Sequence, residues 1–160
     1  MKIAVFLPNW VGDAVMATPA LSAIRRRWPD GEVVAVLRPY VADVLEGTGL
    51  VDRVIDWDPR DKTHESSGWK LARQLRRERF DAAVLFPNSL RSGWMAWLSG
   101  ATRRIGFARD ARRWLLTDPI PVTSRGVPHP VLDDYLRLAA ELDCPSGDHR
   151  MHLALSLIHI

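Results

Sequence analysis

The sequence lacks the features that define several common classes of protein. Cys144 is its only cysteine, so no internal disulfide framework is possible, which fits a reducing compartment. No apolar run approaches the length of a membrane span. The N-terminus begins with Lys2 and apolar residues, as a signal peptide does, but its apolar region would have to contain Pro8 and Asp13. We therefore expect a cytoplasmic protein, for which a peripheral contact with a membrane stays open.

Glycine-rich phosphate loops are absent as well. The turn after the first apolar segment contains one glycine, Gly12, whereas the dinucleotide fingerprint needs three. Neither a P-loop nor a Gly-x-Ser-x-Gly nucleophile elbow is present, which disfavours P-loop and serine-hydrolase chemistry. Cys144, His149 and His152 are too few for a closed metal site, so we interpret the histidines as surface residues and expect no metal and no cofactor.

Lysine is scarce, and arginine supplies most of the positive charge. The 22 basic residues include only three lysines, and the formal net charge is +3. Guanidinium groups suit phosphate and carboxylate ligands, although a codon preference for arginine explains the bias equally well. One basic cluster is interleaved with aromatic residues, and it comprises Arg91, Arg103, Arg104, Arg109, Arg112 and Arg113 with Trp94, Trp97, Phe107 and Trp114. The small net charge and the absence of a known motif disfavour nucleic acid and favour an anionic, partly lipidic ligand.

Apolar segments and helical patterns alternate along the chain. Continuous apolar runs predict buried strands at residues 3–7, 32–37, 51–57, 80–86 and 102–107. Helical spacing predicts helices at residues 13–28, 40–46, 68–79, 89–98 and 130–142, a short helix at 109–116 and an edge segment at 118–123. This order predicts an α/β fold, a Rossmann-like parallel sheet with helices on both faces. We expect one domain at residues 1–150 and a truncated or foreign tail at 151–160.

Two helices have features that predict their local structure. Pro19 lies inside the first helical pattern, so we expect a kink or a late restart there. In the helix at 89–98, four large apolar residues share one face, and we interpret that face as packed against the sheet; they are Leu90, Trp94, Trp97 and Leu98.

Polar turns follow three of the predicted strands, at residues 8–13, after Trp57 and at 87–91. Right-handed crossovers place the carboxyl ends of parallel strands on one edge of the sheet, so these turns should converge in space. Asp13 lies where the first helix should begin. Its carboxylate can cap that helix or accept a proton from a substrate hydroxyl, and the sequence leaves both roles open.

Four segments in order resemble the ADP-heptose:lipopolysaccharide heptosyltransferases of glycosyltransferase family 9, and among them the heptosyltransferase II type. They are PNWVGDAVMATPAL at 8–21, FPNSLRS at 86–92, GATRRIG at 100–106 and RRWLLTD at 112–118. The resemblance implies a GT-B fold, in which two Rossmann-like domains face a cleft. This chain is then the N-terminal, acceptor-binding half, and the C-terminal donor domain is absent from it.

The resemblance also implies a reaction and a set of site residues. The reaction is inverting transfer of heptose from ADP-heptose to the lipid A-linked inner core, next to the inner membrane; this half alone should be inactive. Asp13 matches the catalytic aspartate. The expected acceptor-binding residues are Asn9, Trp10 and Gly12 in the first turn, Asn88, Ser89 and Arg91 in the second, and Arg60 and Lys62 in a basic loop. The alternative is a non-catalytic Rossmann-like module that binds a nucleotide or an anionic glycan.

Overall fold

The computed structural model describes residues 1–58, 60, 68–109, 111–122, 129–145 and 147–154. Its centre is a parallel sheet in the order β3-β2-β1-β4-β5-β6. The strands are β1 (Lys2–Phe6), β2 (Glu32–Leu37), β3 (Arg53–Asp56), β4 (Ala82–Leu85), β5 (Arg103–Phe107) and β6 (Asp118–Ile120). This is the strand order of a Rossmann fold, with the chain reversing direction across the sheet between β1 and β4. The predicted fold class is confirmed.

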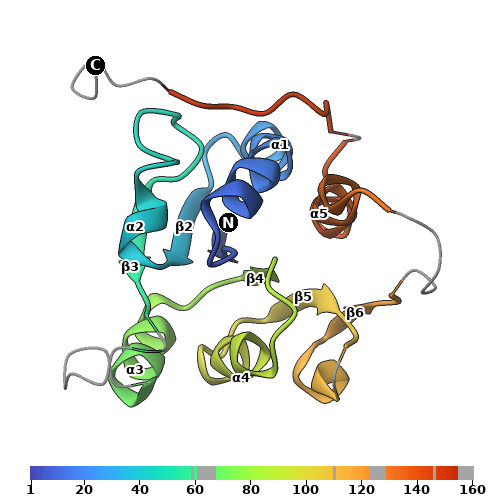
Figure 1. Ribbon diagram of the computed structural model, residues 1–160. Helices are drawn as coiled ribbons and strands as arrows, with labels where there is room; N and C mark the ends of the chain where they lie inside the picture. The colour runs from blue at the N-terminus through green and yellow to red at the C-terminus, as the bar shows by residue number, and fades with distance from the viewer. Residues whose placement is uncertain (59, 61–67, 110, 123–128, 146, 155–160) are drawn as a thin grey trace.

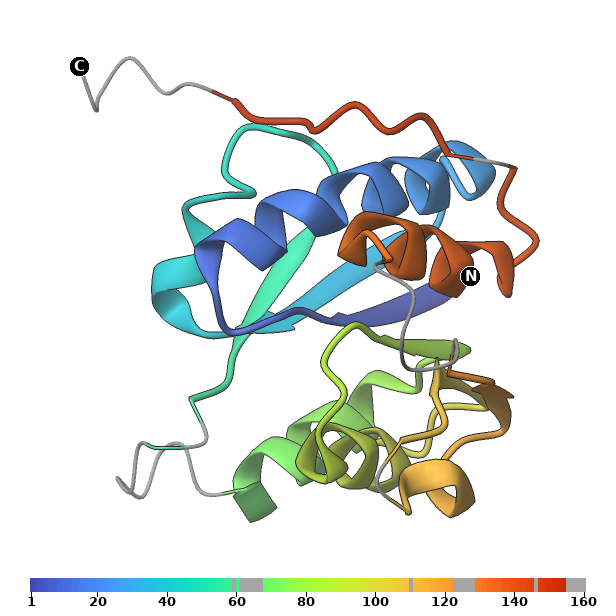
Figure 2. The same cartoon turned by 45° about the vertical axis from the view of Figure 1, so that its right-hand side comes forward.

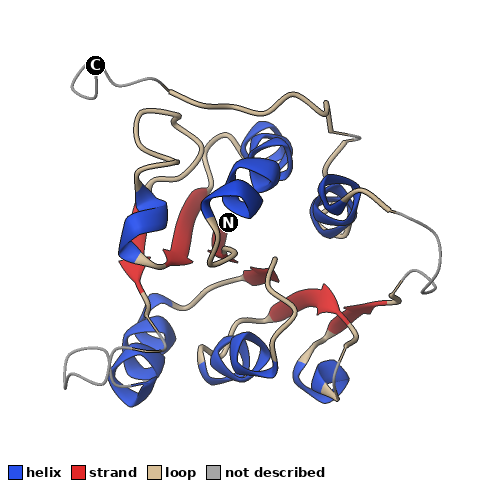
Figure 3. Ribbon diagram, viewed as in Figure 1, coloured by secondary structure: helices blue, strands red, loops and turns tan. Residues whose placement is uncertain are grey.

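Helices cover both faces of the sheet (Figures 1 and 3). They are α1 (Val11–Arg27), α2 (Pro39–Ala42), α3 (Gly68–Glu78), α4 (Leu90–Leu98), the 3-10 helix η1 (Arg112–Leu115) and α5 (Val131–Ala140). Figure 2 shows α1 and α5 side by side on one face, while α3, α4 and η1 lie on the other. Each face therefore has its own apolar core, one built around α1 and α5 and one around α3 and α4.

Helix α1 runs without interruption through Pro19, so the predicted restart is wrong. In a helix, the N–H of residue 19 would donate to the carbonyl of Val15, but proline has no N–H group. The hydroxyl of Thr18 donates to that carbonyl at 2.7 Å instead. The helix also begins at Val11, two residues before the predicted start. Among the described residues, no helix has both the length and the apolar character needed to cross a bilayer.

The predicted packing of α4 is largely wrong. The buried residues are Ser92, Gly93, Met95 and Ala96, whereas Leu90, Trp94 and Trp97 are exposed. Gly93 lets the helix lie close to η1, since a Cβ at this position would lie 3.4 Å from the Cβ of Arg112. Leu98 alone of the predicted face packs, in part, against the core.

Several other predicted elements differ from the structure in extent. The helix predicted at 40–46 ends at Ala42, and the one predicted at 109–116 is only the 3-10 turn η1. The edge segment is β6, where Pro119 is tolerated because an edge strand has no partner on its outer side. The tail is described only to Ala154, where it has no regular structure, so the domain boundaries stay a prediction.

An ion-pair network joins the amino ends of the strands to α3. Glu78 at the end of α3 accepts hydrogen bonds from Arg53 at 2.7 Å and from Lys2 at 2.5 Å. These two donors lower the pKa of Glu78 to about 2, from an ordinary value of 4.5. The network ties the first strand and the edge strand β3 to a helix that follows them both in sequence.

Glu78→Gln should therefore reduce stability in a pH-dependent way. A carboxylate with a lowered pKa stabilises the fold fully above its unfolded pKa of 4.5 and loses that contribution as the pH falls toward 2. Thermal unfolding should show a gap between the wild type and the variant that is widest above pH 5 and closes on acidification. Glu46→Gln, at an exposed site, serves as the control. A gap independent of pH would contradict the assigned role of Glu78.

Candidate functional site

The three polar turns meet at the carboxyl edge of the sheet, as the sequence predicts. They surround a cavity of about 380 Å³ lined by Leu7, Asn9, Arg38, Trp57, Arg60, Pro87, Ser89, Arg91 and Ser92. The cavity lies beside the ends of β1 and β4, where the order of the strands reverses. Ligands of open parallel sheets bind in such a crevice.

The described lining of this cavity contains three arginines and no carboxylate. Arg60 and Arg91 were expected there, whereas Arg38 was not. The Nε atom of Arg38 is buried without a hydrogen bond in the described structure and lies 3.6 Å from a carboxylate oxygen of Asp58. Three guanidinium groups give the cavity a positive potential that favours an anionic ligand. Because Arg38 directly follows β2, the rule that placed the other turns at this edge also applies to it.

A short hydrogen-bonded chain fixes the first turn. Arg38 donates to the hydroxyl of Tyr40 at 3.3 Å, and that hydroxyl donates to the backbone carbonyl of Asn9. Tyr40 belongs to α2, which follows the neighbouring strand. The turn after β1 is therefore held from outside its own segment.

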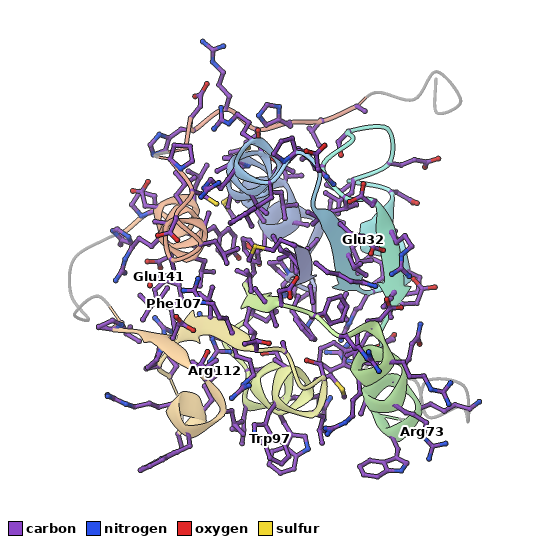
Figure 4. All side chains as sticks on the ribbon, turned by 180° about the vertical axis from the view of Figure 1, so that it is seen from behind. Glu32, Arg73, Trp97, Phe107, Arg112 and Glu141 are labelled. Atoms are coloured by element: carbon purple, nitrogen blue, oxygen red, sulfur yellow. The ribbon has the colours of Figure 1, made fainter. Side chains whose placement is uncertain are left out.

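The second turn is held by Arg112, whose side chain is fully buried. Its guanidinium donates to four acceptors in or next to this turn, namely the carbonyls of Pro87 (2.6 Å) and Ser89 (3.2 Å), the hydroxyl of Ser92 (3.2 Å) and the side-chain oxygen of Asn88 (3.4 Å). A fifth hydrogen bond goes to the carbonyl of Phe107 at 2.7 Å. Figure 4 shows Arg112 between the sheet and the helices α4 and η1. Ser89 also caps α4 by accepting a hydrogen bond from the N–H of Ser92 at 3.2 Å.

Sequence reasoning grouped Arg112 with other arginines in a basic cluster for an anionic ligand, whereas its side chain is fully buried and holds backbone carbonyls. Two other arginines of this cluster also have partners within the protein. Arg103 pairs with Asp118 at 2.8 Å, and Arg104 donates to backbone carbonyls. One sequence signal for the burial of Arg112 exists in Gly106. A Cβ on Gly106 would lie 3.0 Å from Nη2 of Arg112, so the guanidinium packs closely against the strand at this glycine.

Asp13 is the third residue of α1 and does not cap it. The N-cap position belongs to Trp10, whose side chain makes no capping hydrogen bond, so the predicted capping role is wrong. In the described structure, the half-buried carboxylate of Asp13 makes no hydrogen bond and no ion pair. Burial, and then the negative charge of Asp13, raise the pKa of Tyr135 on α5. Tyr135 packs against Phe86, which directly precedes the second turn, with ring centroids 5.1 Å apart.

The structure brings some of the predicted site residues together at the cavity and leaves others outside its lining. Asn9, Arg60, Ser89 and Arg91 line it. Four predicted residues are not part of the lining, namely Trp10, Gly12, Asp13 and Asn88. Trp10 is 74% exposed, and a Cβ on Gly12 would meet no atom within 4 Å, so the first turn of α1 is open to a ligand. Lys62 lies outside the described residues.

Metal-binding side chains do not gather in the part of the chain that the structure describes, where no group of three or more His, Cys, Asp or Glu residues could hold an ion. His149 instead pairs with Asp133 at 2.8 Å. Burial raises the pKa of the Cys144 thiol to about 11, which keeps it protonated and unreactive near neutral pH.

A Rossmann-type sheet with a positively charged cavity at its switch point defines an α/β ligand-binding domain. The family description "Glycosyltransferase family 9 (heptosyltransferase)" matches residues 68–158, more than half of the sequence. The chain belongs to this family of glycosyltransferases, which confirms the resemblance found in the sequence.

Characterised relatives and a solved structure agree with this assignment. The chain is 29% identical over 122 residues to lipopolysaccharide heptosyltransferase 2 of Escherichia coli, covering 74% of this chain and 34% of that protein. It is 26% identical over 150 residues to lipooligosaccharide heptosyltransferase 2 of Haemophilus influenzae, covering 92% and 42%. The structure of E. coli ADP-heptose lps heptosyltransferase II superposes with a TM-score of 0.79 at 25% identity, covering 98% of this chain and 47% of that one. The chain thus spans less than half the length of these relatives.

Proposed function

We propose that this chain is the acceptor-binding half of an inverting heptosyltransferase, which transfers heptose from ADP-heptose to the inner core of lipopolysaccharide. One observation carries the proposal: the two turns that resemble the family's motifs meet at the switch point of the sheet, around an arginine-lined cavity. Membership of the heptosyltransferase family supports the reaction class. The similarity to proteins named heptosyltransferase 2 supports the donor and the acceptor.

In the proposed reaction, Asp13 accepts the proton of the attacking acceptor hydroxyl. The hydroxyl oxygen forms a bond to the anomeric carbon of heptose from the face opposite the leaving group. The bond between that carbon and the ADP oxygen breaks, and ADP leaves with the electron pair. Attack from the opposite face inverts the anomeric centre. The carboxylate of Asp13 suits the role of base because it is half-buried at an open helix terminus and holds no hydrogen bond in the described structure.

The remaining residues of the site bind and orient the acceptor. Arg38, Arg60 and Arg91 would neutralise its anionic groups, since charge-assisted hydrogen bonds are the strong ones. Asn9 and Ser89 offer hydrogen bonds to its hydroxyls, and Asn88, held by Arg112, lies next to them. Trp10 and Gly12 shape the turn that leads from the cavity to Asp13. Lys62 stays a predicted acceptor ligand.

The donor would be bound by a second domain, in the part of the relatives that this sequence does not match. The curated relatives are more than twice as long as the part of them that this chain matches. Without a group that positions the ADP leaving group, the effective concentration of the donor at Asp13 is lost, and we expect no transfer by this chain alone. A peripheral contact with the inner membrane, where a lipid-linked acceptor lies, belongs to the same proposal.

Calorimetry on the isolated chain can separate acceptor binding from nucleotide binding. We expect a de-acylated inner-core oligosaccharide to bind, and ADP not to bind. Arg91→Gln should weaken oligosaccharide binding about tenfold or more, because hydrogen bonds to charged groups contribute about 1.5–3 kcal/mol. The control is Arg26→Gln, which makes the same change of charge at an exposed residue of α1 and should have little effect on binding. Tight binding of ADP would contradict the proposal and favour a non-catalytic nucleotide-binding module.

A further inference from the structure

Five large apolar side chains are exposed on the side of the molecule formed by α3, α4 and η1. They are between 46% and 89% exposed, and we refer to them as the tryptophan face: Trp69, Leu90, Trp94, Trp97 and Trp114. All three helices cover the same face of the sheet (Figure 1), so these side chains belong to one side of the molecule. Isolated exposed apolar residues are normal, but a group of this size on a single side marks an interaction surface.

The geometry of this surface is that of protruding rings around a shallow hollow. Trp94 and Trp97 lie one helical turn apart on α4, with ring centroids 5.3 Å apart. Beside them, a hollow of about 290 Å³ is lined by Trp69, Ala72, Arg73, Arg76 and Leu98. In Figure 4, Trp97 and Arg73 extend from their helices in the direction away from the sheet. The residues available for contact therefore combine indole rings with guanidinium groups.

Among the described residues of α3, α4 and η1, basic side chains predominate. Arg73, Arg76 and Arg77 lie on α3, and the exposed Arg113 lies on η1. Helix α4 and η1 contain no acidic residue, and the one acidic residue of α3, Glu78, is paired with Arg53 and Lys2. A partner that covers this surface must supply negative charge next to an apolar layer.

We infer that the tryptophan face binds the interfacial layer of an anionic lipid bilayer. Indole rings favour this layer because one part of the ring system is apolar and its N–H seeks a polar partner. Arginines next to the rings are attracted to anionic headgroups. A symmetric second copy fits poorly, because its arginines would meet those of the first copy, and the only carboxylate described on α3, α4 and η1, that of Glu78, is already paired. The inference deepens the proposed function, on which its biological role rests, by assigning the membrane contact to a defined surface.

Binding of the full chain to vesicles tests this assignment. The chain should co-sediment with vesicles of phosphatidylethanolamine and phosphatidylglycerol, bind phosphatidylcholine vesicles far more weakly, and lose binding as salt is raised. Trp94→Gln with Trp97→Gln should weaken binding about tenfold or more. The control is Val131→Gln with Leu153→Gln, which removes exposed apolar side chains outside this face and should leave binding unchanged.

The contribution of the arginines to vesicle binding is tested by two double variants that remove the same amount of positive charge. Arg73→Gln with Arg113→Gln should weaken binding by about fivefold for each arginine. Arg26→Gln with Arg150→Gln gives the same net charge from sites outside α3, α4 and η1 and should have a much smaller effect.

Three results would overturn the assignment: equal binding to neutral vesicles, equal losses in test and control variants, or self-association of the chain that the tryptophan variants abolish. The last would assign the face to a second copy. The vesicles contain neither saccharide acceptor nor ADP-heptose. A lack of vesicle binding would therefore contradict the membrane assignment without contradicting the proposed transfer reaction, which is tested by the transfer assay.

Discussion

Asp13→Asn, made in a protein that joins this chain to a donor domain, is expected to lower kcat for heptose transfer by about 10²- to 10⁴-fold, the range of general-base catalysis. Asparagine keeps the shape of the side chain but cannot accept the proton of the acceptor hydroxyl. The KM for the acceptor should change little, because the arginines that line the cavity remain. The measurement is steady-state transfer with ADP-heptose and an inner-core acceptor.

Asp133→Asn is the matched control for this variant. Asp133 is the third residue of α5, as Asp13 is of α1, and α5 lies beside α1 on the same face of the sheet. Each substitution removes a carboxylate from the first turn of a helix, at a cost of at most about 1 kcal/mol in stability. Only the Asp13 variant should lose turnover. Unchanged turnover in that variant would remove Asp13 as the base.

Arg112→Met should reduce the free energy of unfolding by at least about 3 kcal/mol. The guanidinium donates to five acceptors, four of them at the second turn, and a buried acceptor left without a donor costs about 1–3 kcal/mol. Methionine keeps an unbranched apolar stem but donates no hydrogen bond. Urea unfolding of the chain measures the loss directly.

The neighbouring Arg113 provides a control with the same change of residue type. Its side chain is exposed, so Arg113→Met should change stability by no more than about 0.5 kcal/mol. Arg112→Lys should recover only part of the loss, because a compact ammonium group cannot reach all the acceptors that the wider, planar guanidinium contacts. If Arg112→Met stayed within about 1 kcal/mol of the wild type, the guanidinium would not be what holds the second turn.

The order of strands and helices was predictable because it is encoded locally. Continuous apolar runs such as residues 32–37 indicate strands buried on both faces, and the structure has β2 over the same residues. The crossover rule then placed the turns after β1 and β4 at one edge, where they line a common cavity. The boundaries of α1 were harder to predict, since the effect of Pro19 depends on whether another donor reaches the carbonyl of Val15.

The composition of the site was only partly predictable. Asn9, Ser89 and Arg91 were expected at the cavity and line it. Arg38 was missed because it follows a strand without a turn motif of its own, and Arg112 was misassigned because its neighbours in the sequence are charged. Burial of a guanidinium depends on acceptors supplied by other segments, and no pattern within residues 109–116 reveals them.

The sequence by itself determined the α/β class, the parallel order of elements and the family, because apolar periodicity and motif order are properties of the chain. Only the tertiary structure decided which side of a helix is buried and which charge is neutralised. Periodicity shows that Trp94 and Trp97 share a side of α4, but not that this side is exposed while Gly93 and Ala96 are buried. The physical reason is close packing: small residues let the helix lie close to the rest of the domain, and the side with large ones remains exposed for a partner.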